Sequence, residues 1–163
     1  MTEVPLFRGA LSPDQWVKEQ AKKLDEIRKK AGDVLYWQCV AELCKASEWF
    51  LIRYVLDWGW IDEDLIGRDL LGFYRIHDND DTAVFIPRGF AKTLTEAARL
   101  VKRILNNPNG AWLYASATED LANDFGKMVG EILLTNAKLH RAFPHILPCS
   151  SADVKRWGKD GYE

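Results

Sequence analysis

Short apolar runs alternate with longer amphipathic stretches between residues 82 and 134. Residues 82–86 and 111–115 are brief apolar runs of the kind that form buried strands. Residues 92–105 and 119–134 place apolar side chains at helical spacing, and polar turn sequences separate them from the runs. Strand, helix, strand, helix predicts an α/β fold, a parallel sheet with crossover helices.

The first half of the chain has a different pattern, in which helical spacing dominates. Ser12 and Gln15 have the spacing of a capping box, and an apolar face follows as far as Gly32, which offers a stop. A second helix is predicted over 33–56 and a third, short one within 61–74. We therefore predict a helical N-terminal region over residues 1–77 and the first, incomplete part of an α/β domain over 78–163.

Charge and cysteine usage exclude several classes of protein. The formal net charge of −2 gives no chain-wide electrostatic footprint for nucleic acid, so a DNA contact needs a local patch. The most apolar stretch, residues 34–60, is interrupted by charged residues and is not expected to span a membrane. Cys39, Cys44 and Cys149 lack metal-ligand spacing, and buried free thiols are the expectation for the first two. The sequence predicts a soluble protein of a reducing compartment.

The segment that carries chemistry is residues 85–93, Phe-Ile-Pro-Arg-Gly-Phe-Ala-Lys-Thr, between a predicted strand and a predicted helix. Free backbone N–H groups and the positive end of the helix dipole converge at such a junction and favour phosphate. Lys92 is predicted to contact the β- and γ-phosphates, and the Thr93 hydroxyl to bind Mg²⁺. The usual pattern has glycine where this chain has Ile86 and Ala91.

Residues 87–93 resemble the deviant phosphate loop of the large terminase subunit of tailed bacteriophages, in which an arginine stands early and a small residue precedes the lysine. Residues 112–119 resemble the second strand of that family and its exit. Residues 139–144 and 155–162 are similar to later segments of its ATPase domain. The likeness covers about residues 50–163 and does not place residues 1–49.

The resemblance implies a motor that hydrolyses ATP to drive viral DNA into a procapsid. It implies that Arg88 and Lys92 are catalytic, that the loop from Arg88 through Gly89, Phe90 and Ala91 to Thr93 holds ATP, and that Thr93 contacts Mg²⁺. The implied partners are double-stranded viral DNA, the small terminase subunit and the portal protein, with a homo-oligomer on the portal. The implied location is the host cytoplasm, on the procapsid, and no membrane.

The sequence lacks one part that ATP hydrolysis needs. No acidic residue after Lys92 ends an apolar strand, so we expect the catalytic carboxylates to be absent and this portion alone not to turn over ATP at a useful rate. Phe73, Tyr74 and His77 are candidates to stack on the adenine base of ATP.

Two alternative functions stay open. One alternative is another P-loop ATPase, a helicase-like translocase, which a Walker B strand and coupling motifs in the full gene would distinguish. The other is a non-catalytic interaction module, in which the helical half binds a partner and the loop is vestigial.

Overall fold

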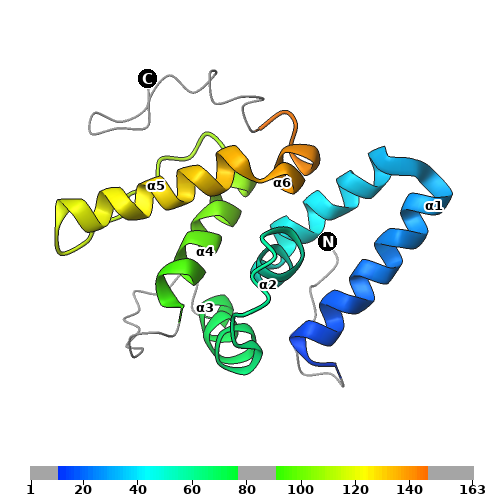
Figure 1. The fold of residues 1–163 in the computed structure, drawn as a ribbon, viewed down its shortest axis with the longest axis horizontal. Coiled ribbons are helices and arrows are strands. Elements are labelled where there is room, and N and C mark those ends of the chain that lie inside the picture. The colour runs from blue at the N-terminus through cyan, green and yellow to red at the C-terminus, as the bar shows by residue number, and fades with distance from the viewer. Residues whose placement is uncertain (1–10, 77–90, 147–163) are drawn as a thin grey trace.

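The computed structural model describes residues 11–76 and 91–146, and every regular element within these two ranges is helical (Figure 1). The elements in chain order are α1 (Pro13–Ala46), α2 (Glu48–Phe50), the π-helical segments η1 (Leu51–Val55) and η2 (Glu63–Leu70), α3 (Leu71–Ile76), α4 (Lys92–Asn106), α5 (Glu119–Thr135) and α6 (Ala137–Ala142).

The predicted α/β fold with a parallel sheet is wrong for the part of the chain that the structure describes. The strand expected over 82–86 lies outside the described residues, whereas residues 111–115 are described and form no strand. A strand needs a neighbour for its backbone N–H and C=O groups, and the described residues offer none beside this segment. Tyr114 stacks instead on Phe125 of α5, and Leu113 is 97% exposed. The described architecture is all-α.

Helix α1 is folded into two arms by a sharp corner at Gly32 (Figure 1). The capping box at its start is confirmed, because the Ser12 hydroxyl accepts from the backbone of Gln15 while the Gln15 side chain accepts from the backbone of Ser12. Gly32 has φ 82° and ψ −179°, a conformation that only glycine adopts readily. Across the corner, Arg28 Nε donates to the Asp33 carboxylate at 2.6 Å. The predicted helix stop at Gly32 is confirmed.

Alanine substitution at two glycines should change stability in opposite directions. Gly32→Ala should lower the free energy of unfolding by about 1–3 kcal/mol, because the backbone must stay in a region that alanine avoids. Gly126→Ala, in the interior of α5, should raise it by about 0.5–1 kcal/mol, because alanine is the better helix former. A Cβ at either position meets no atom within 4 Å, so crowding does not confuse the comparison. Urea denaturation followed by circular dichroism measures both, and equal effects would contradict the corner geometry.

The core is built around α2 and η1, in which most side chains are buried. Four of their side chains, Phe50, Leu51, Ile52 and Val55, are at most 1% exposed. The second arm of α1, together with α4, α5 and α6, adds further buried side chains, among them Val40, Cys44, Ala97, Val101, Phe125 and Leu139. One cluster therefore draws on residues from both sides of position 77, and the domain boundary proposed there remains a prediction.

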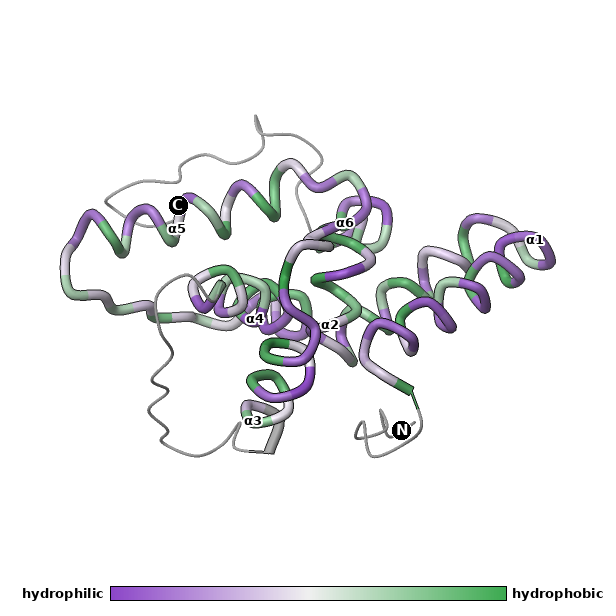
Figure 2. The backbone as a smooth tube through the Cα atoms, turned by 60° about the horizontal axis from the view of Figure 1, so that its bottom comes forward, coloured by the Kyte–Doolittle hydropathy of each residue, from purple (hydrophilic) through white to green (hydrophobic). Residues whose placement is uncertain are grey.

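Helices α4 and α5 lie close to their predicted bounds. Along α5, hydrophobic and hydrophilic residues alternate in short stretches, as amphipathic packing requires (Figure 2). The N-cap of α5 is Thr118, whose hydroxyl accepts from the backbone N–H of Leu121. Ser116 and Glu119 also have the spacing of a capping box, but Ser116 lies three residues before Glu119, the first residue of α5, and is exposed.

The cysteines that the structure describes are free thiols. Cys44 is buried and Cys39 is half-buried, so the expectation of burial is confirmed for Cys44 and in part for Cys39. Burial raises the pKa of the Cys44 thiol to about 12. Cys149 lies outside the described residues. None of the helices in the described ranges combines the length and the apolar character that crossing a membrane requires.

Candidate functional site

The N-terminal end of α4 is the part of the predicted phosphate-binding segment that the structure describes. Ala91 precedes the helix in the left-handed region, with φ 51° and ψ 20°, and its methyl group offers no capping oxygen. Its carbonyl accepts from the backbone N–H of Thr95 at 2.9 Å and from the Thr95 hydroxyl at 3.0 Å. The N–H groups of Lys92, Thr93 and Leu94 have no partner among the described residues. This is the arrangement in which a helix end binds an anion.

The charges in the first turn of α4 also favour an anion. Lys92 and Thr93 are both exposed, and no acidic residue stands in this turn. The nearest carboxylate along the helix belongs to Glu96, which is engaged by Arg99 at 3.2 Å. The helix dipole and the Lys92 ammonium group therefore act at the same end without an opposing charge on that turn. A phosphate would be bound by backbone N–H groups and Lys92, with the Thr93 hydroxyl beside it.

Packing against the core holds this helix end in place. Thr95, Ala97, Ala98 and Val101 are fully buried along one face of α4. Farther along the helix, Lys102 Nζ donates to Glu48 of α2 at 2.8 Å. Because the buried face fixes the helix axis, the direction of the free N–H groups is set by the core.

Tyr74 joins α3 to α4 one to two turns beyond the candidate site. The Arg99 guanidinium lies 3.7 Å from the centroid of the Tyr74 ring, and the Tyr74 hydroxyl is hydrogen-bonded to Glu96. Burial, followed by the bond to Glu96, raises the pKa of the Tyr74 phenol. Tyr74 is thus covered by Arg99 and is not an open platform for a base. Of the other two candidates, Phe73 is exposed and His77 lies outside the described residues.

The Tyr74 contact was missed by sequence reasoning. The spacing of Glu96 and Arg99 on a helix indicates their pairing, but nothing local indicates that a tyrosine of another helix contacts both of them. Tyr74 is a support of the first turns of α4 rather than a ligand contact.

The predicted site residues divide into two groups. Arg88, Gly89 and Phe90 lie outside the described residues, and Ala91, Lys92 and Thr93 lie together at the start of α4. Within the described ranges, no group of three or more His, Cys, Asp or Glu side chains is placed to hold a metal ion. Mg²⁺ at this position would depend on the Thr93 hydroxyl, water and phosphate oxygens, a ligand set that Mg²⁺ commonly takes in nucleotide sites.

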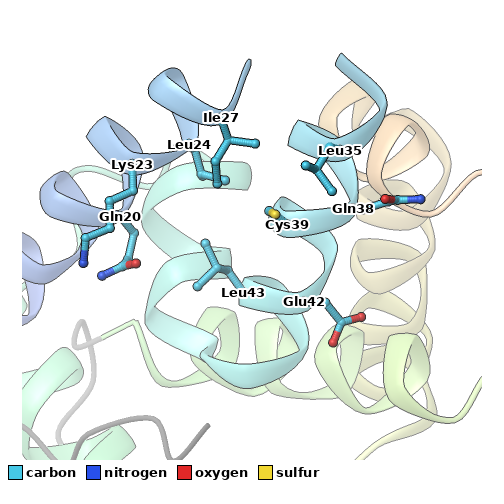
Figure 3. A pocket seen from close by; sticks show the side chains of 9 residues that line it. All are labelled: Gln20, Lys23, Leu24, Ile27, Leu35, Gln38, Cys39, Glu42 and Leu43. Atoms are coloured by element: carbon cyan, nitrogen blue, oxygen red, sulfur yellow. The ribbon is translucent and has the colours of Figure 1, made fainter. Parts of the chain in front are cut away.

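A groove lies between the two arms of α1 (Figure 3). Its volume is about 480 Å³, and its lining combines the apolar side chains Leu24, Ile27, Leu35, Cys39 and Leu43 with Gln20, Lys23, Gln38 and Glu42. The apolar side chains of the two arms face one another across the opening (Figure 3). Because the surface that lines this groove is mainly apolar and has none of the phosphate-binding features of α4, the groove suits an apolar partner rather than a nucleotide.

A comparison with known protein families, curated proteins and solved structures found no match to this chain. The candidate site therefore rests on the geometry of the first turn of α4 and on the resemblance of residues 87–93 to the terminase loop.

Proposed function

We propose that the chain binds ATP with Mg²⁺ at the N-terminal end of α4, as the ATPase portion of a viral DNA-packaging terminase large subunit. The observation that carries the proposal is the first turn of α4, which has uncapped N–H groups, no carboxylate, and exposed Lys92 and Thr93. These are the groups that hold a triphosphate tail in a nucleotide-driven motor. The resemblance of residues 87–93 to the terminase loop is the reason for proposing ATP as the substrate.

The roles follow from the chemistry of each group. The Lys92 ammonium would neutralise charge on the β- and γ-phosphates, and the Thr93 hydroxyl would help to hold the Mg²⁺ that offsets their charge. By resemblance, Arg88 stabilises the γ-phosphoryl oxygens, and Gly89 lets the backbone approach the phosphates. The proposed work is translocation of double-stranded viral DNA into a procapsid in the host cytoplasm. The proposed partners are the small terminase subunit and the portal, on which copies of the chain assemble.

Lys92→Ala should weaken Mg²⁺–ATP binding by about tenfold or more, because a charge-assisted contact to phosphate is lost. Binding is measured by titration with a fluorescent ATP analogue, with and without Mg²⁺. Thr93→Ala should mainly reduce the increase in ATP affinity that Mg²⁺ causes. Lys127→Ala is the matched control, because it removes an exposed lysine of α5 and should leave binding unchanged.

Both Lys92 and Thr93 are exposed, so their variants should keep the helical spectrum and the melting temperature of the parent chain. A parent chain that binds no ATP at millimolar concentration would contradict the proposal. So would a Lys92→Ala variant that binds as tightly as the parent.

The groove between the arms of α1 favours a second candidate function, an interaction module whose helical half binds an apolar segment of a partner protein. Its apolar lining and open shape are the specific support. The two candidates separate on one measurement. ATP binding that depends on Lys92 supports the first, and a folded chain that binds no ATP supports the second.

A further inference from the structure

The connection between α4 and α5 contains an apolar segment, residues 111–115, which we call the connecting segment. It runs back alongside α5 (Figures 1 and 2). Within the part of the chain that the structure describes, no backbone group of residues 111–117 bonds to another backbone group. Its three large side chains are exposed, Trp112 at 42%, Leu113 at 97% and Tyr114 at 41%. An unpaired backbone that carries apolar side chains is a template for a further strand.

Neighbouring side chains of the connecting segment point in different directions. The Tyr114 ring stacks on the buried Phe125 ring of α5, with centroids 3.8 Å apart and planes at 13°. Leu113, the preceding residue, is almost fully exposed and faces away. These two residues have opposite environments, as neighbouring residues of a strand do. Within the described part of the chain, the segment contacts α5 through Tyr114 and leaves Leu113 uncovered.

The charge pattern around the connecting segment allows two copies to approach each other. Residues 104–118 include no charged side chain, from the residue after Arg103 to the residue before Glu119. Edge strands of natural proteins usually carry charges that block pairing between copies, and here none is present. The connecting segment itself therefore adds no like-charge repulsion to a symmetric contact.

The sequence of the segment, Ala-Trp-Leu-Tyr-Ala, is self-complementary in antiparallel pairing. With Leu113 of one copy opposite Leu113 of the other, Trp112 lies opposite Tyr114, and Ala111 lies opposite Ala115. Aromatic cross-strand pairs of this kind stabilise a ribbon, and the stacked Phe125 of each copy would cover one of its faces.

We propose that the connecting segment pairs antiparallel with the same segment of a second copy of this chain, about a two-fold axis at Leu113. Each copy then offers partners to backbone groups of the other that have none among the described residues, and the contact is closed at two copies. This inference does not depend on nucleotide binding at α4.

The two-fold axis provides a charge-swap experiment. The parent chain should be dimeric by sedimentation velocity, and Leu113→Lys and Leu113→Glu should each weaken association by about tenfold or more, because like charges face each other. An equimolar mixture of the two variants should recover a mixed dimer, which native mass spectrometry identifies by its mass. Val34→Lys is the matched control. Val34 is 75% exposed on α1, so this change adds the same charge elsewhere and should leave the dimer unchanged.

Leu113→Cys gives an independent readout, since thiols at directly opposite positions should form a disulfide between copies under mild oxidation. Three results would overturn the proposal. They are a parent chain that is monomeric up to roughly 100 µM, charged variants that dimerise like the parent, and a mixture that stays monomeric. Leu113 is exposed, so circular dichroism of each variant should match that of the parent.

Discussion

Phe50→Ala should lower the free energy of unfolding by about 3–5 kcal/mol, the cost of removing a buried ring and leaving a cavity. Phe50 is fully buried in α2. Its ring stacks on Tyr54, with centroids 4.8 Å apart, and meets Trp16 edge-on at 6.2 Å. The change therefore removes contacts to α1 and to η1 at once. Urea denaturation followed by circular dichroism measures the loss.

Trp60→Ala is the control for this prediction, because Trp60 is 66% exposed and its removal should change stability by no more than about 0.5 kcal/mol. If Phe50→Ala does not fold, the stability of the milder variant Phe50→Leu can be measured in its place. It retains most of the apolar volume and should cost only about 1–2 kcal/mol. A loss below about 1 kcal/mol in Phe50→Ala would show that this ring is not part of a packed core.

Asp14→Ala should lower the free energy of unfolding by about 2 kcal/mol, because two donors lose their acceptor. The Asp14 carboxylate accepts from Arg53 Nε at 2.8 Å and from Trp49 Nε1 at 3.0 Å. The Arg53 side chain is only 10% exposed, whereas that of Asp14 is 28% exposed. Partial solvation of Asp14 keeps the expected loss below that of a fully buried pair.

A double-mutant cycle tests whether the Asp14 contacts act as a unit. Trp49→Phe keeps an aromatic ring but removes the indole donor, so the loss in the double variant should be smaller than the sum of the single losses. Glu19→Ala is the control, because its pair with Lys23 is exposed and should contribute at most about 0.5 kcal/mol. Equal losses for Asp14→Ala and Glu19→Ala would contradict the network.

Much of the helical structure was predictable because its signals are local. The start and the end of α4 were predicted to within a residue, since amphipathic spacing and the turn after Asn106 act within a few residues. The Ser12 capping box and the corner at Gly32 were predictable for the same reason. Of the candidate site, the position of Lys92 and Thr93 at a helix start followed from the sequence. The left-handed conformation of Ala91 and the absence of a cap did not.

The amino-acid sequence by itself determined where the chain forms helices, because i to i+4 hydrogen bonds, caps and helix stops involve neighbouring residues. Only the tertiary structure decided what residues 111–115 become and which residues pair over long distances. An apolar run forms a strand only beside another strand, and in the described structure the Tyr114 ring stacks on Phe125 of α5 instead. Likewise, Asp14 meets Arg53, and Tyr74 meets Arg99, only because the core brings separate helices together.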